Sequence, residues 1–420
     1  MFSKTKRPLG RALLAASCAA TFVSVPARAE IVLVEKDGWS VSTNGRANGF
    51  YSYEFGDYQP TGGTPGEGGI VSTPFQAAPD DAEQTKFSVS RVHSGFVGSI
   101  FGLTVKKQIT PTLHALAHME LWWPIETDQF RGYSSMVPDP RESYVRVEGS
   151  WGSLQAGRAL GLHDRGATLT DFFYANGYSI GGPCNAILQG PLCGNIGYGY
   201  QFPGYNASIN YSTPKFAGLQ LTVGAYDPSK VGYGGSELLR LPVPRIESEA
   251  TFDTVGSGYK FSAYVNGMWQ EAGGDVMGEP KMIHAYGVGY GARVEVSGFK
   301  LGVGGNYDIG GGDFSALVGP VPIDSASKLR RTDGYFGQAM YSIGPVDLAA
   351  GAGVTRIMET KEDILSEKSV IKTRLGMNLT FNYHLEPVVF NAQLFRAKHD
   401  YWRGEHQNLT FIHTGMTFVW

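Results

Sequence analysis

Apolar and polar residues alternate with a period of two along most of the chain. In residues 205–211 every second side chain is apolar, and the side chains between them are Asn or Ser. Residues 374–383 repeat the pattern with larger apolar residues. Alternation of this kind gives a strand one apolar and one polar face, whereas an amphipathic helix repeats every three to four residues. The pattern therefore predicts a chain built from β-strands.

About sixteen segments follow this pattern, and the last one reaches the end of the chain. They lie at 41–55, 87–107, 111–123, 141–150, 153–159, 204–213, 218–228, 246–256, 258–270, 283–297, 299–308, 333–343, 346–356, 369–384, 387–398 and 408–420. Short turns alternate with long polar connections such as 56–86, 160–203 and 309–332. An even number of strands joined in this way is typical of a transmembrane barrel, whose closure leaves no strand edge in hydrocarbon. We therefore expect an all-β fold, a transmembrane antiparallel β-barrel of about sixteen strands.

The first 29 residues differ from the rest of the chain. Four basic residues precede an apolar stretch at 12–25, and a small-residue triplet follows at 27–29. This order is that of a secretory signal peptide, so we expect residues 1–29 to be removed and residues 30–420 to form the barrel domain. The apolar stretch is shorter than the roughly 20 residues that a spanning helix needs. Cys18 leaves a lipoprotein signal as an alternative.

Charge and composition narrow the class further. Residues 1–29 hold five of the 35 basic residues and none of the 38 acidic ones, so the mature chain is more acidic than the whole, whose net charge is −3. An acidic exported chain without a basic run argues against a nucleic-acid partner. The chain has 57 Gly and only 17% charged residues, and no linker divides the part after the signal peptide. One large closed sheet fits these features better than several globular domains.

The last strand carries the most specific short signal. Trp420, Phe418 and Met416 share one face, and the chain ends on an aromatic residue. This terminal pattern resembles the signal that the outer-membrane assembly machinery recognises, which makes that machinery an expected partner.

Several motifs in the first half of the chain resemble those of the Gram-negative general-diffusion porins. They are Asn44-Gly45-Arg46-Ala47, Ser90-Arg91 with Gly95-Phe96-Val97-Gly98, Arg141-Glu142-Ser143-Tyr144-Val145, and Gly157-Arg158. The resemblance covers almost the whole mature chain, although its second half keeps only the alternation. It implies a homotrimer in the lipid of the outer membrane, through which small polar solutes and ions diffuse passively without any cofactor. It also implies that the third loop, 160–203, folds into the barrel.

The same resemblance implies a narrow point in the lumen with opposed charges. It places Arg46, Arg91 and Arg141 on a basic wall, with Arg158 as a further candidate at the end of its strand. It places Asp171 on the acidic side, in the third loop. Opposed charges act strongly there, because the water between them is confined by low-dielectric walls. For each arginine, a place at the rim or in a loop is the alternative.

Some charged positions leave alternatives open. Asp164 is either a second acidic residue of the narrow point or a partner of Arg165 within the loop. Arg146 lies on the face opposite Arg141 if their strand is regular. It therefore occupies an aqueous rim or subunit contact, or else the register slips between the two. Ala175 stands where the family pattern has a second carboxylate.

Other functional classes fit the sequence less well. A substrate-specific channel for sugars or organic ions would often carry an aromatic track in its lumen. Four tryptophans could form such a track or an outer girdle: Trp122, Trp123, Trp269 and Trp402. Residues 177–181 match the G-x-S-x-G form of a hydrolase, but that motif needs a strand-to-helix elbow and here lies in a Gly/Pro-rich loop. An adhesin would need much larger loops, and we expect no enzymatic activity.

No metal site is expected from the spacing of the histidines. His114 and His118 are four residues apart on a predicted strand, hence about 13 Å apart at 3.3 Å per residue. They cannot bind one metal ion together, and we expect them to face the lumen with Glu120.

Cys184 and Cys193 are the cysteines that remain after signal cleavage, and both lie in the third loop. In an oxidising compartment we expect them to form a disulfide, with two free thiols as the alternative. The bridge either stiffens the loop at the narrow point or staples an extracellular tip.

The disulfide can be tested by mass spectrometry. We expect the unreduced mature chain to be lighter than the reduced chain by two hydrogen atoms, because one S–S bond replaces two thiols. Labelling of both thiols by a maleimide without prior reduction would contradict the bridge.

Overall fold

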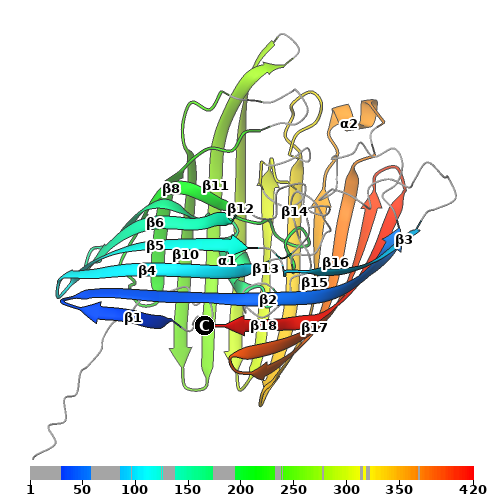
Figure 1. Cartoon of the computed structure of the whole chain (residues 1–420). Coiled ribbons are helices and arrows are strands. Elements are labelled where there is room, and N and C mark those ends of the chain that lie inside the picture. The colour runs from blue at the N-terminus through cyan, green and yellow to red at the C-terminus, as the bar shows by residue number, and fades with distance from the viewer. Residues whose placement is uncertain are drawn as a thin grey trace, which may run out of the picture.

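The computed structural model describes residues 30–57, 86–95, 97–123, 125, 138–173, 194–231, 238, 240–276, 279–312, 316–317, 322–367 and 369–420. Their strands form one closed antiparallel sheet, the expected all-β barrel (Figure 1). The strands are β1 (Ile31–Lys36), β2 (Trp39–Asp57), β3 (Lys86–His93), β4 (Ser99–Thr110), β5 (Leu113–Trp123), β6 (Asp139–Gly149), β7 (Gly152–Leu160), β8 (Tyr205–Ser212), β9 (Leu219–Tyr226), β10 (Arg245–Gly256), β11 (Tyr259–Val276), β12 (Glu279–Val296), β13 (Phe299–Ile309), β14 (Arg331–Ile343), β15 (Val346–Ile357), β16 (Ile371–Leu385), β17 (Val388–Tyr401) and β18 (His406–Val419). Two short helices, α1 (Arg165–Thr170) and α2 (Lys361–Leu365), lie in connections between strands.

The strands occupy sixteen positions around the barrel. β3 and β4 both pair with β2 along one edge and run in the same direction, so they share one position. β18 and β1 share the other edge in the same way, because β18 ends with Val419 opposite Arg46 and β1 begins with Ile31 opposite Thr43. All sixteen predicted segments are present, with 87–107 divided into β3 and β4. β1 is an additional short strand.

The barrel closes where β18 pairs with β2. The Gly45 N–H donates to the Trp420 carbonyl at 2.7 Å, and the Trp420 N–H donates to the Gly45 carbonyl at 3.0 Å. A Cβ at Gly45 would lie 2.4 Å from the Trp420 ring, so glycine leaves the room that the terminal side chain fills. Phe418 and Met416 are exposed on the outer face, as the alternation predicted.

Each strand has an apolar outer face and a polar inner face. On β16, Met377, Leu379 and Phe381 are exposed, whereas Asn378 and Thr380 between them are buried. Apolar side chains exposed on the outside of a closed barrel form the band that hydrocarbon covers. Within the described ranges, no helix is long and apolar enough to cross a membrane.

The connection between β7 and β8, residues 161–204, is called L3 below, and its described parts, 161–173 and 194–204, enter the barrel. Its helix α1 packs against β11, β12 and β13, several strands along the wall from β7 (Figure 1). Its backbone lies on glycines of the inner wall. A Cβ at Gly353 would lie 1.7 Å from the Tyr198 carbonyl oxygen, and one at Gly334 would lie 2.6 Å from the Gly199 carbonyl oxygen. The expected inward fold of the third loop is therefore confirmed.

Barrel closure can be tested at the last residue. We expect deletion of Trp420 to lower the folded, membrane-embedded fraction sharply, because β18 then loses its last two backbone hydrogen bonds to β2. The measurement is the heat-modifiable gel mobility of the membrane fraction. Trp151→Ala is the control, since this exposed tryptophan lies in the turn before β7 and takes no part in closure. Equal folded fractions for the deletion and the wild type would contradict the role of Trp420.

Candidate functional site

Arg46 and Arg91 lie on the inner face of adjoining strands. Both side chains are buried, Arg46 on β2 and Arg91 on β3. Arg91 is opposite Ser52 in the register, and its charge acts on Glu54, two residues further along β2. The Ser52 hydroxyl donates to the Glu54 carboxylate at 2.8 Å. This wall therefore carries both signs of charge at one level.

An irregularity between β5 and β6 decides the direction of two further arginines. The register shifts near the start of β6 and leaves Arg141 as an extra residue. The Arg141 guanidinium lies over the ring of Trp122, which is buried on the inner face, at 4.8 Å from the ring centroid. Arg146 Nε donates to Gln155 Oε1 at 2.9 Å, also on the inner face. Both arginines therefore face the lumen. Of the alternatives for Arg146, the structure supports the one in which the register slips between Arg141 and Arg146.

Arg158 points the other way. It lies opposite Ser143 on β6 and Ala207 on β8, and Ala207 shares its face with the exposed Ile209. Counting from Gln155, which is buried on the inner face, gives the same outward direction. The predicted place of Arg158 on the pore wall is corrected accordingly, because alternation along β7 turns its side chain outward.

Two carboxylates of β10 hold the start of L3. Glu247 Oε2 accepts the backbone N–H groups of Leu162 and of the next residue, at 2.6 and 3.1 Å. Glu249, on the same face of β10, accepts a hydrogen bond from Arg165 Nε at 3.0 Å. Arg165 is thus paired with the wall, and the alternative of a pair with Asp164 inside the loop is not realised. L3 has no strand partner for these N–H groups, so wall carboxylates accept them.

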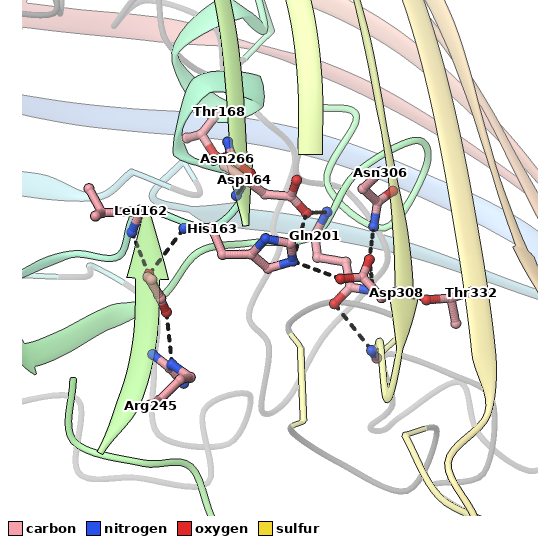
Figure 2. A network of polar contacts seen from close by, with 12 residues as sticks. Leu162, His163, Asp164, Thr168, Gln201, Arg245, Asn266, Asn306, Asp308 and Thr332 are labelled. Atoms are coloured by element: carbon pink, nitrogen blue, oxygen red, sulfur yellow. Dashed lines mark hydrogen bonds and ion pairs between the residues drawn. The ribbon is translucent and has the colours of Figure 1, made fainter. Parts of the chain in front are cut away.

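His163 and Asp164 join L3 to β11 and β13 (Figure 2). His163 Nε2 lies 2.7 Å from Asp308 Oδ1 and 3.9 Å from Asp164 Oδ2. The Asp164 N–H donates to Asn266 at 3.0 Å, and its carboxylate accepts the N–H of Gln201 at 3.0 Å. Burial alone would lower the pKa of His163, but the charges of Asp164 and Asp308 outweigh it and raise that pKa to about 9.

Asp171 is fully buried and holds two parts of L3 together. Its carboxylate accepts the N–H groups of Phe173 at 2.9 Å and Asn195 at 2.7 Å, and the hydroxyl of Tyr200 at 3.0 Å. Burial raises the pKa of the Asp171 carboxyl to about 6, against the opposing effect of these hydrogen bonds. The carboxylate fixes the loop, and its predicted action on permeating ions stays a prediction.

The returning part of L3 docks on β15 and β17. The Gly199 N–H donates to Thr355 Oγ1 at 2.9 Å, and the Tyr198 hydroxyl lies 2.9 Å from His399 Nε2. L3 is thus attached to the wall from β10 to β17. The predicted arginines Arg46, Arg91 and Arg141 lie on other strands, β2, β3 and β6. The structure therefore does not bring the predicted arginines and the two loop aspartates into one cluster.

Comparison with known proteins decides the family. A family model described as Gram-negative porin matches residues 14–351. The chain belongs to the Gram-negative porin family. The predicted resemblance is thereby confirmed, and the fold and family are those of an outer-membrane channel for diffusion. No curated protein matches the chain.

Solved structures share the fold of this porin. The outer membrane channel DcaP of Acinetobacter baumannii is 15% identical, with a TM-score of 0.66 over 92% of this chain and 99% of that chain. An anion-selective porin from Comamonas acidovorans is 15% identical, with a TM-score of 0.60 over 91% and 100% of the two chains. OmpF of Salmonella typhi, in complex with daunomycin, is 12% identical, with a TM-score of 0.56 over 93% and 100%. At these identities the likeness is one of fold.

Sequence reasoning missed the wall residues that hold L3 of this porin. They include Glu247, Glu249, Asp308 and Gln338, all buried at inner positions of their strands. One sequence signal could have indicated them, namely a long or charged polar side chain at a lumen-facing position of a strand in the second half of the chain. His118 and Glu120, which were expected to face the lumen, are buried there; His118 Nε2 lies 3.6 Å from Glu142 Oε2.

Four predictions concern residues outside the described ranges. They are the cleaved signal peptide at 1–29, the disulfide between Cys184 and Cys193, the absence of a hydrolase elbow at 177–181, and the place of Ala175. All four stay predictions.

Gln338 on β14 offers a test of how L3 is held. Its Nε2 donates to the Thr170 carbonyl at 2.6 Å, and its Oε1 accepts the Phe172 N–H at 3.0 Å. Gln338→Leu leaves both buried backbone groups unpaired, at a cost of about 1–3 kcal/mol each. We expect a lower unfolding temperature and a noisier single-channel current.

The matched control is Gln220→Leu on β9, where Gln220 Nε2 donates to the Thr213 carbonyl at 2.9 Å. The same side chain is lost there without touching L3, so the current noise stays at the wild-type level. If Gln338→Leu showed the current noise and the unfolding temperature of the wild type, Gln338 would not be needed to hold L3.

Proposed function

We propose that this porin is a passive channel for small polar solutes and ions, narrowed by L3. The attachment of L3 to the inner face from β10 to β17 is the observation that supports this most directly. A loop held by buried hydrogen bonds at many points narrows the lumen as a fixed part of the wall. Size and charge then decide which solutes pass, without a binding step that saturates.

The positions of four tryptophans favour this proposal over a substrate-specific channel. Trp269 is exposed on the outer face. Trp402 packs against an apolar cluster beyond the end of β17, and Trp123 follows Trp122 on the opposite face of β5. Of the four, Trp122 alone faces the lumen, so they do not line a continuous track along which a sugar could slide.

The arginines of the wall support an electrostatic filter. The loop contributes less directly, because Asp164 and Asp171 are the only carboxylates in residues 161–204 and both are buried. We propose that Arg46, Arg91 and Arg141 act directly on permeating ions, while Asp171 acts through the position of L3. A unit charge at 4 Å contributes about 1 kcal/mol even in water, and more beside low-dielectric walls. A pair of such charges is enough to change ion preference several-fold.

The family also supports proposals about the surroundings of the porin. We propose that residues 1–29 are cleaved after export and that the mature chain forms a homotrimer in outer-membrane lipid. The assembly machinery of that membrane recognises the terminal pattern of Trp420, Phe418 and Met416. The proposal includes no cofactor, no nucleic-acid partner and no catalytic role for residues 177–181.

The filter can be tested by removing two charges from the wall. We expect Arg46→Gln combined with Arg91→Gln to shift the ion preference toward cations, because two positive charges leave the lumen. The measurement is the reversal potential in planar bilayers under a salt gradient. The shift is expected to shrink as salt rises, since the Debye length falls from about 10 Å at 0.1 M to about 3 Å at 1 M.

Arg158→Gln is the control, because it removes one positive charge from the outer face of β7. Its reversal potential stays at the wild-type value if only lumen charges matter. Unchanged potentials in the double variant at low salt would remove Arg46 and Arg91 from the filter and leave the channel assignment intact.

A further inference from the structure

His163, Asp164 and Asp308 form a group of potential metal ligands where L3 docks on β13 (Figure 2). One ligand atom from each side chain lies within 4.8 Å of the others. His163 and Asp164 come from L3 and Asp308 comes from the wall, so a species bound by all three joins the loop to the barrel. All three side chains are buried. No ligand spacing is visible in the sequence, because 145 positions separate His163 from Asp308.

Buried polar atoms without a hydrogen-bond partner surround this group. Within the described part of the chain, Asp164 Oδ1, His163 Nδ1 and Asn306 Oδ1 have none. An unpaired buried polar atom costs about 1–3 kcal/mol, and a charged one costs more. The orphaned oxygen of Asp164 therefore points to a bound species at this place.

Glycines in the wall beneath the group let its side-chain oxygen atoms gather there. A Cβ at Gly289 would lie 2.2 Å from Asp164 Oδ1 and 2.5 Å from Asn266 Oδ1. A Cβ at Gly287 would lie 1.8 Å from Asp308 Oδ1. Two glycines of β12 thus create a hollow into which three oxygen atoms project.

The charges of the group call for a cation. Two carboxylates meet one imidazole in a buried site, and the neighbouring Glu247 is already balanced by Arg245, whose Nε lies 2.8 Å from Glu247 Oε1. Buried unbalanced charge is costly. A divalent cation balances Asp164 and Asp308 while leaving His163 neutral and able to ligate.

We propose that His163 Nε2 and one oxygen each of Asp164 and Asp308 bind a divalent cation of the zinc or manganese type, which ties L3 to β13. One imidazole nitrogen with two carboxylate oxygens suits these metals better than calcium, which takes oxygen ligands. The cation replaces the proton between His163 and Asp308. Their 2.7 Å contact then widens to about 3.3 Å, the separation of ligands in a tetrahedral zinc site.

The test measures metal content and thermal stability of the full mature chain. Because the ligands are buried and one comes from the wall, the cation enters as L3 docks. The chain is therefore refolded into detergent with Zn²⁺, Mn²⁺, Ca²⁺ or EDTA and then washed. We expect one Zn²⁺ or Mn²⁺ retained per chain by mass spectrometry of the elements, and a higher unfolding temperature than after refolding with EDTA. Asp308→Asn loses both effects, with an apparent affinity at least about tenfold lower.

Asp347→Asn is the matched control. Asp347 Oδ2 lies 2.8 Å from His384 Nε2 on the same inner wall, but the pair belongs to no three-ligand group among the described residues. This variant retains the metal. His163→Gln replaces Asp308→Asn if the latter does not show the heat-modifiable mobility of a folded barrel.

Three outcomes overturn the proposal. They are a folded wild type that holds no Zn²⁺ or Mn²⁺ and unfolds at the same temperature with EDTA, equal metal retention in Asp308→Asn, and stabilisation by Ca²⁺ alone. If the folded wild type holds no metal, protons rather than a cation balance the carboxylates of Asp164 and Asp308. Planar-bilayer conductance separates this result from the proposed function, because a metal-free wild type that conducts leaves the channel assignment in place.

Discussion

Hydrocarbon offers no hydrogen-bond partner to a peptide group, and this constraint governs the whole structure. The sheet has to close, and it does so on one edge of β2, where β18 ends at Val419 and β1 continues from Ile31. Once the sheet is closed, every strand has lipid on one side and the lumen on the other. The alternation of side chains follows from that geometry. Pairing between strands provides hydrogen-bond partners for the backbone groups. The side chains of the inner face are not needed for this purpose and can carry charge.

L3 meets the same constraint without a ladder. Several of its described backbone N–H groups outside the helix have side chains as acceptors, because buried peptide groups are nearly always paired. Glu247 and Asp171 supply them as carboxylates, whose hydrogen bonds are stronger than those of neutral acceptors. This explains why Asp171, which the family pattern marks as a lumen charge, is buried within the loop. Its four hydrogen-bond donors all belong to L3. The negative charge of Asp171 therefore stabilises the fold of the loop.

The strands were predictable because alternation is local, and the exceptions are places where it fails. β1 was not predicted, because residues 31–34 are all apolar and exposed and therefore show no alternation. Arg146 could not be placed from β6 alone, since the extra residue at Arg141 is visible only in the pairing with β5. The partners of L3 were out of reach for another reason. Phe172 and Gln338 are 166 positions apart, and no local pattern links them.

The inner glycines show that the position of L3 is built into the wall as well as into the loop. Gly353 and Gly376 leave no room for a side chain, because a Cβ would lie 1.7 Å from the Tyr198 carbonyl oxygen in one case and 2.8 Å from the Tyr198 ring in the other. Tyr198 of the loop fills the space that these glycines leave. Docking of the loop on the wall therefore also narrows the lumen. The described hydrogen bonds between L3 and the wall run from β10 to β17. Arg46 and Arg91 lie on the inner face of β2 and β3, and this is why we expect the filter there.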